Sequence, residues 1–163
     1  MQKNTNQFIY ISAKQQMMHC FENDNAYRIY LVSTGKNGLG EQNGSGCTPR
    51  GWHVIYSRIG LNKPINTVFV SRKPTGETYS SELALRYPKR DWILTRILQL
   101  DGLEEGRNRG GEVDSLRRYI YIHGTPDTKE LGKPASHGCI RMRNEDVIEL
   151  TDWIIPGARV YIE

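Results

Sequence analysis

Short runs of β-branched and aromatic residues, interrupted every few positions by turn-forming residues, constrain the fold of this chain most. Side chains of this kind suit a pleated, half-buried surface, so each run is predicted to be a β-strand. The predicted strands cover residues 8–12, 16–22, 26–33, 52–59, 67–70, 92–100, 119–122 and 158–162. The first three strands lie so close together that they are expected to form a β-meander.

Helical periodicity is confined to two places. Val147, Leu150, Thr151 and Ile154 recur at helical spacing after Asn144, which is a good N-cap residue, and Pro156-Gly157 ends the pattern. A second short helix is predicted at 81–86. The sequence therefore predicts one mainly β domain over 1–163 with one or two short helices, most simply a β-sandwich of two sheets.

Three polar segments separate the predicted strands. The loop at 35–51 contains six glycines but lacks the residue order of a phosphate-binding loop, which argues against nucleotide binding. The segment at 71–91 is read either as a functional lid or as a solvated excursion. The segment at 101–117 is charged and glycine-rich, and it leads directly into the strand at 119–122.

The composition limits the classes of partner. No apolar run approaches the length of about 18 residues that a membrane span requires. The net charge of +4 and the pI near 9.0 favour an anionic substrate. Nucleic acid fits on charge alone, but neither a nucleic-acid partner nor a membrane partner is expected.

The N-terminus and the cysteines bear on the compartment. Residues 1–7 are polar and do not resemble a signal peptide, so a cytoplasmic protein is expected; a periplasmic one is the alternative if the start has been trimmed. Cys20, Cys47 and Cys139 form no C-x-x-C pair, which favours a reducing compartment. Cys20 and Cys47 are expected to be incidental, which leaves Cys139 as the thiol of interest.

The stretch from 118 to 143 concentrates residues that carry chemistry. His123 ends an apolar strand. Cys139 follows it after a loop and comes immediately after Gly138 in the sequence. A catalytic cysteine needs a base and donors for an oxyanion. Either His123 or His137 is a candidate base, and the N–H groups of Gly138 and Cys139 are candidate oxyanion donors.

His123 is the preferred base, because a histidine only two positions before Cys139 shares its side of an extended segment without meeting its sulfur well. The carbonyl of Gly124 would then hold the imidazole tautomer. A metal site formed by His123, His137 and Cys139 is the main rival, although no fourth ligand stands at a recognisable spacing. A purely structural role for these residues is the third possibility.

These residues resemble the signature of the L,D-transpeptidase catalytic domain (YkuD type) of bacterial cell-wall enzymes. The resemblance rests on His123-Gly124, on Ser136-His137-Gly138-Cys139-Ile140-Arg141-Met142 and on Asn144, and it extends upstream through Val32-Ser33-Thr34-Gly35, Thr48-Pro49-x-Gly51 and Tyr121-Ile122. It implies a β-sandwich of mixed sheets that needs no cofactor. It also implies that the substrate is a peptidoglycan tetrapeptide or muropeptide.

By motif position, the resemblance makes Cys139 the nucleophile, His123 the base and Gly124 the residue that orients it. Gly138 and Cys139 would form the oxyanion hole. Site-lining positions fall on Ser136, His137 and Arg141.

The implied reaction is attack on the diaminopimelate–D-Ala bond of a tetrapeptide stem, through a thioester. Together with the polar start, the resemblance favours a hydrolytic L,D-carboxypeptidase of murein recycling. The first alternative is an L,D-transpeptidase that forms 3-3 cross-links or attaches amines or proteins to the wall. A metal-dependent peptidase and a non-catalytic peptidoglycan-binding module are more distant alternatives.

Overall fold

The computed structural model describes residues 6–163, so the polar residues 1–5 lie outside the described part of the chain. Within this part, ten strands form one sheet. They are β1 (Gln7–Ser12), β2 (Met17–Glu22), β3 (Asn25–Ser33), β4 (Gly51–Ile59), β5 (Thr67–Val70), β6 (Lys73–Thr78), β7 (Ile93–Gly102), β8 (Tyr121–Gly124), β9 (Ile140–Met142) and β10 (Arg159–Ile162).

The sheet curls until its two halves face each other. Its strand order is β4-β10-β1-β2-β3-β9-β8-β7-β5-β6, and an additional pairing of β4 with β7 brings the two halves together. Most neighbouring strands are antiparallel, but β1–β10 and β8–β9 are parallel. The prediction of a mainly β, sandwich-like fold is thus confirmed, with both layers coming from one continuous mixed sheet.

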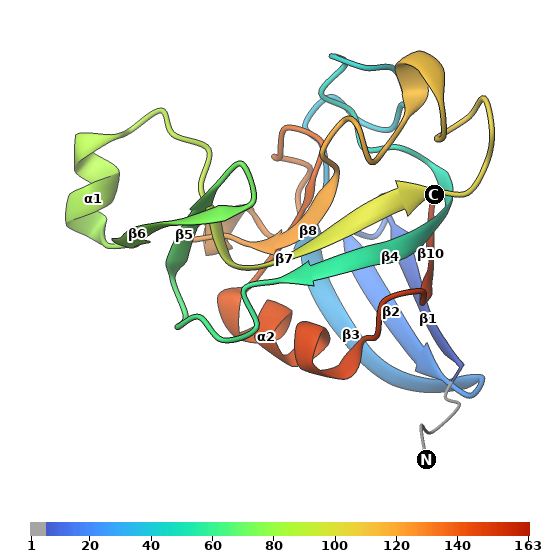
Figure 1. Ribbon diagram of the computed structural model, residues 1–163, viewed down its shortest axis with the longest axis horizontal. Coiled ribbons are helices and arrows are strands. Elements are labelled where there is room, and N and C mark those ends of the chain that lie inside the picture. The colour runs from blue at the N-terminus through green and yellow to red at the C-terminus, as the bar shows by residue number, and fades with distance from the viewer. Residues whose placement is uncertain (1–5) are drawn as a thin grey trace.

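The core lies between the curled layers and is covered at one side by α2 (Asn144–Trp153) (Figure 1). Val147 and Leu150 on the helix, and Ile154 at its C-cap, pack into the main apolar cluster, as their spacing predicted. Asn144 is not the N-cap, however, and that prediction is wrong. The cap position falls on Arg143, which makes no side-chain cap bond. The Asn144 side chain does not cap the helix because it binds the Thr95 hydroxyl instead.

The polar segment at 71–91 is more ordered than the sequence indicated. Residues 73–78 form β6, which pairs with β5 as a hairpin, and α1 (Ser81–Arg86) follows with Ser80 as its cap. Figure 1 shows this hairpin and α1 projecting from one side of the sandwich. The strand was missed because its residues, which include Pro74 and Gly76, lack β-forming character.

The strand that carries His123 is shifted relative to its prediction. It was placed at 119–122, but β8 covers Tyr121–Gly124. Tyr119 instead lies in a turn with φ of 58°, a conformation that aromatic residues seldom adopt. A short 3₁₀ helix, η1 (Gly111–Val113), precedes this turn. A second one, η2 (Thr128–Glu130), follows β8.

Within residues 6–163, no helix has the length and apolar character needed to cross a membrane.

Candidate active site

Two parallel strands, β8 and β9, bring the predicted histidine and cysteine together. His123 on β8 lies opposite Arg141 on β9. Cys139, the residue just before β9, lies beside Tyr121. Alternate residues of a strand share a face, so Tyr121, His123, Cys139 and Arg141 line one side of the pair. The thiol and the imidazole are therefore diagonal neighbours on adjacent strands.

His123 is held in a fixed orientation. The residue is 1% exposed, and its Nδ1 lies 2.7 Å from the carbonyl oxygen of Gly124. When Nδ1–H donates to that carbonyl, Nε2 is the unprotonated nitrogen and can accept a proton. Burial lowers the pKa of His123 below its ordinary value, although the Gly124 hydrogen bond and the charge of Asp91 act in the opposite direction. The ring is thus neutral near pH 7, as a general base must be.

Burial of the sulfur favours the protonated form of the Cys139 thiol. Its Sγ accepts the backbone N–H of Tyr121 and donates to the carbonyl of Tyr119, both at 3.3 Å. The residue keeps a partly exposed surface, but protein atoms surround the sulfur, and this burial raises the pKa of the thiol to about 12. Among the described residues no hydrogen bond joins this sulfur to His123, so the thiol must rotate before it can transfer its proton.

The loop before Cys139 positions two backbone N–H groups. Gly138 has φ of 124°, and a Cβ there would lie 3.0 Å from the carbonyl oxygen of Cys47, so a side chain would be strained. The Gly138 N–H donates to Ser136 Oγ at 3.1 Å, and the same hydroxyl donates to the Cys139 carbonyl at 2.5 Å. In residues 6–163 the Cys139 N–H has no acceptor. The oxyanion role of Gly138 and Cys139 stays a prediction.

Thr48 ties the glycine-rich loop to the cysteine loop. Its buried hydroxyl donates to the Gly138 carbonyl and accepts the N–H of Gly35, both at 2.8 Å. The loop at 35–51 therefore directly contacts the backbone that precedes Cys139, which the sequence did not indicate.

Replacing Thr48 by valine is expected to lower both stability and any activity of this site. The valine keeps the shape but leaves two buried backbone groups unpaired, which costs about 1–3 kcal/mol of unfolding free energy. Denaturant unfolding measures that loss. Thr75→Val is the matched control, since the Thr75 hydroxyl makes its hydrogen bonds to Glu77 at the surface; equal losses in both variants would contradict the assignment.

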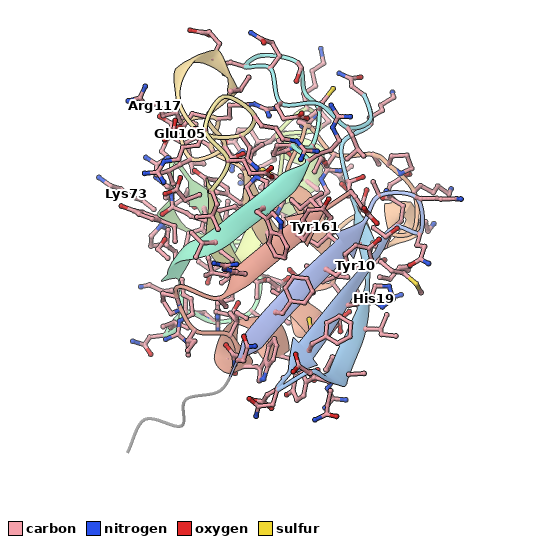
Figure 2. All side chains as sticks on the ribbon, turned by 90° about the vertical axis from the view of Figure 1, so that its right-hand side faces the viewer. Tyr10, His19, Lys73, Glu105, Arg117 and Tyr161 are labelled. Atoms are coloured by element: carbon pink, nitrogen blue, oxygen red, sulfur yellow. The ribbon has the colours of Figure 1, made fainter. Side chains whose placement is uncertain are left out.

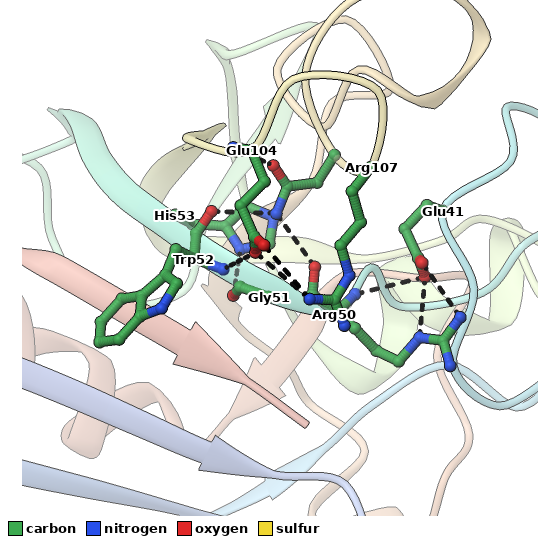
Figure 3. Close-up of polar contacts among 8 residues, drawn as sticks. Glu41, Arg50, Gly51, Trp52, His53, Glu104 and Arg107 are labelled. Atoms are coloured by element: carbon green, nitrogen blue, oxygen red, sulfur yellow. Dashed lines mark hydrogen bonds and ion pairs between the residues drawn. The ribbon is translucent and has the colours of Figure 1, made fainter.

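Arg118 and Glu104 join the surrounding loops. The Arg118 guanidinium donates to the carbonyls of Cys47 at 2.7 Å and Glu41 at 3.1 Å, which braces the loop at 35–51. The Glu104 carboxylate accepts the N–H of Trp52 at 2.7 Å and contacts Arg107, while Glu41 pairs with Arg50 at 3.0 Å (Figure 3). These contacts tie the loop at 35–51 and the loop after β7 to each other and to the start of β4.

Asp91 is the site residue that sequence reasoning missed most clearly. One carboxylate oxygen lies 3.0 Å from Arg141 Nη2, and the other lies 3.2 Å from His137 Nδ1. Burial opposes ionisation, yet the His137 hydrogen bond and the nearby charges of His123 and Arg141 hold the pKa of the carboxyl below its ordinary value. His137 itself is largely exposed, whereas Arg141 is buried beside His123.

Asp91→Asn is expected to lower any kcat/KM of this site by about 10-fold, because the buried Arg141 loses its carboxylate partner beside His123. Turnover at several pH values measures the effect, since a neutral amide also removes a charge that raises the pKa of His123. Glu82→Gln removes an exposed ion pair from the neighbouring α1 and serves as the control. A variant indistinguishable from the wild type would show that Asp91 has no role.

Asn144 joins the segments next to His123 through hydrogen bonds of its side chain. Its Oδ1 accepts the Thr95 hydroxyl at 2.6 Å, and its Nδ2 donates to Asn66 and to the Thr125 carbonyl at 3.2 and 3.4 Å. A Cβ on Gly124 would lie 2.3 Å from this Oδ1, so the position admits only glycine. The sequence motif contained Asn144, but its helix-capping tendency concealed this role.

The β5–β6 hairpin brings a cation to the rim of the site. Arg72, at the hairpin turn, lies 4.7 Å over the ring of Tyr119 and donates to the Tyr121 hydroxyl at 3.0 Å. Both tyrosines also supply the backbone groups that hold the Cys139 sulfur. The lid interpretation of 71–91 stays a prediction, but the segment does contact the site through Arg72.

The described residues contain no group of three or more His, Cys, Asp or Glu side chains arranged to hold a metal ion. His123, His137 and Cys139, the ligand set considered from the sequence, are therefore not gathered around one point.

Comparison with known proteins places this site within a described family. The family model for the L,D-transpeptidase catalytic domain (YkuD) matches residues 6–162. A Bacillus subtilis (strain 168) protein named L,D-transpeptidase YkuD is 48% identical over 61 residues, or 34% of this chain and 37% of that protein. Escherichia coli (strain K12) YbiS, also named an L,D-transpeptidase, is 28% identical over 121 residues, or 69% of this chain and 39% of that protein. The aligned regions thus span well under half of these relatives.

Solved structures share the fold across nearly the whole chain. An L,D-transpeptidase from Mycobacterium smegmatis superposes with a TM-score of 0.61 at 17% identity, covering 98% of this chain and 59% of that one. The structure of LdtMt1 in complex with imipenem gives a TM-score of 0.60 at 18% identity, covering 98% and 59%. At these identities the similarity establishes the fold.

Proposed function

Because this chain belongs to the YkuD family of L,D-transpeptidase catalytic domains, we propose that it transfers an acyl group from a peptidoglycan stem peptide through a thioester on Cys139. The observation that carries the proposal is the placement of the Cys139 thiol and the Gly124-oriented imidazole of His123 on one face of two adjacent parallel strands.

The first half-reaction follows from the protonation states. The thiol rotates away from the Tyr119 carbonyl and gives its proton to His123 Nε2 as sulfur attacks the substrate carbonyl. The Cys139 N–H, which has no acceptor among the described residues, stabilises the oxyanion. The amine of D-alanine then leaves with the proton from the imidazolium, and the remaining tripeptide stays on sulfur as a thioester.

The second half-reaction releases the acyl group and restores the free thiol of Cys139. His123 takes a proton from the acceptor, the acceptor attacks the thioester, and sulfur leaves and regains its proton. In the proposal the acceptor is water, which makes the protein an L,D-carboxypeptidase. Hydrolysis requires only a water beside His123, whereas transpeptidation requires a second stem with its amine placed there. A stem amine as acceptor remains the rival.

Cationic side chains around the thiol suit a substrate that carries carboxylates. Arg72 lies at the rim, and the charge of Arg118 is close enough to Cys139 to lower the pKa of the thiol, although less than burial raises it. Arg141 is already paired with Asp91, which also contacts His137. Its proposed contribution is therefore to position His137 and the surroundings of His123. His137 and Ser136 remain proposed substrate-lining residues.

Incubation of the protein with a disaccharide tetrapeptide tests the proposal. D-alanine and the disaccharide tripeptide are the expected products by mass. Cross-linked dimers formed on addition of a second stem would identify the amine as the acceptor. Loss of turnover with a chelator but not with a thiol alkylator would overturn the cysteine mechanism, and no turnover of any stem would favour a non-catalytic module.

The pH profile of kcat/KM reports the same two groups. Activity is expected to fall on the acid side as His123 becomes protonated, and this limb should lie below the ordinary histidine value of 6.5 because burial lowers the pKa of His123. No alkaline fall is expected, because burial raises the pKa of the thiol to about 12, and loss of its proton would leave a thiolate, which is the stronger nucleophile. An acid limb above 6.5, or an alkaline limb near neutrality, would contradict a neutral thiol–imidazole resting state.

A further inference from the structure

Aromatic rings gather on the outer face of the curled sheet. Residues at alternate positions of β1, such as Ile9 and Ile11, are buried in the core, so their neighbours Phe8 and Tyr10 point outward. Rings from the adjacent strands β2, β10 and β4 stand beside them. We call this set the aromatic face: Phe8, Tyr10, His19, Phe21, Trp52 and Tyr161.

The rings form one continuous surface across four strands. Tyr10 and Tyr161 are nearly parallel, with centroids 6.4 Å apart and planes 11° apart, and Trp52 lies 4.9 Å from Tyr161. Phe8 connects them to Phe21, at 5.8 Å. Figure 2 looks onto this face and shows Tyr161, Tyr10 and His19 in sequence across neighbouring strands. Trp52 keeps 37% of its surface exposed.

Polar groups are fixed at the edges of these rings. The Tyr10 hydroxyl donates to the Glu163 carboxylate, and His19 Nε2 lies 2.9 Å from Gln15 Oε1. The Arg159 guanidinium lies 5.8 Å from the Trp52 ring. Each of these groups retains further hydrogen-bonding capacity, so the face offers donors and acceptors beside apolar ring surfaces.

Two hollows open beside Phe8. One, of about 320 Å³, lies between Phe8, Trp52, Asp24 and Arg159, and the other, of about 240 Å³, lies between Phe8 and Phe21. The larger hollow is within the size range of small-molecule sites. Its rim carries one carboxylate and one guanidinium, whose charges balance. That balance suits a neutral ligand with many hydroxyl groups better than a polyanion.

We propose that the aromatic face binds the glycan of peptidoglycan, a β-linked amino-sugar polymer. The C–H faces of pyranose rings carry slight positive charge and pack against aromatic faces, while their hydroxyl and acetamido groups accept and donate at the ring edges. The inference rests on the proposed function, because the stem peptides that the thiol site would process are covalently attached to this polymer. The face thus holds the substrate polymer at a second place.

The test measures glycan binding and peptide turnover separately. The probes are a tetramer and a hexamer of β-1,4-linked N-acetylglucosamine, both uncharged, titrated by calorimetry. Wild-type protein is expected to bind both, and Trp52→Ala and Tyr161→Ala to weaken binding at least about 10-fold. Tyr56→Ala is the matched control, since Tyr56 is exposed on the same face of β4 but is not part of the ring cluster.

Each outcome decides the matter. Wild type that binds neither probe, or a Trp52→Ala variant that binds as well as the wild type, overturns the proposal. Self-association that is lost in Trp52→Ala, without glycan binding, assigns the face to a second copy of the chain instead. If the variants do not fold, ring-proton shifts of Trp52 and Tyr161 in the wild type on titration with the hexamer replace them; unchanged shifts overturn the proposal.

Turnover of a soluble tetrapeptide without glycan is recorded for the same samples, because it reports the thiol site alone. Turnover without glycan binding leaves the proposed function standing and removes only this inference. Glycan binding without turnover removes the proposed function and leaves a glycan-binding module.

Discussion

Cys139→Ala is expected to abolish D-alanine release from a tetrapeptide stem. The thiol is the only nucleophile proposed here, and its removal prevents the thioester from forming, so turnover should fall by about 10³-fold or more. The substitution removes a sulfur that packs beside Phe69 and Ile97 and makes two backbone hydrogen bonds, so thermal unfolding must show that the variant is folded.

Cys47→Ala is the matched control for that experiment. Cys47 is also free and partly exposed, and it lies in the loop that packs against Gly138, but that contact uses its carbonyl and not its thiol. Its substitution should leave turnover near the wild-type rate. Retained activity in Cys139→Ala, or its loss in Cys47→Ala alone, would assign the chemistry to another thiol or to none.

His123→Gln is expected to reduce kcat by about 10²–10⁴-fold, the usual contribution of a general base. Glutamine retains a side-chain amide that can reach the Gly124 carbonyl but cannot accept the thiol proton. The thiol of the wild type is neutral, with its pKa raised to about 12, so loss of the base cannot be offset by a preformed thiolate. Single-turnover kinetics measure the acylation step directly.

The pH dependence of that variant separates catalysis from structure. Without a base, residual activity should rise with pH as hydroxide or thiolate becomes available, and the acid limb assigned to His123 should disappear. Glu82→Gln, which changes an exposed side chain on α1, should keep the acid limb of the wild type. An unchanged acid limb in His123→Gln would mean that another residue is the base.

The fold class was predictable, and the candidate motif around Cys139 was recognisable, because both depend on local signals. Strand-forming runs, turn residues and the spacing of Val147, Leu150 and Ile154 are all read within short windows. The mainly β fold was confirmed on this basis. Glycine at 124 and 138 was also visible, and close backbone contacts explain both positions.

The remainder of the site depends on contacts between distant segments. The parallel pairing of β8 with β9, which places His123 opposite Arg141, joins residues on either side of a loop and has no sequence signature. Asp91 and Arg72 lie in a polar segment whose hairpin was not recognised, because Pro and Gly hide β6. Asn144 was assigned to capping because the same side-chain chemistry serves a helix end and a buried polar contact equally well.

The most direct test of the cysteine mechanism is the intact mass of the protein after it has been mixed briefly with a disaccharide tetrapeptide and then quenched at low pH. The account predicts one added mass, equal to the disaccharide tetrapeptide minus D-alanine, located on the peptide that contains Cys139 and removable by hydroxylamine. D-alanine release without any adduct on Cys139, or an adduct on another residue, would contradict it.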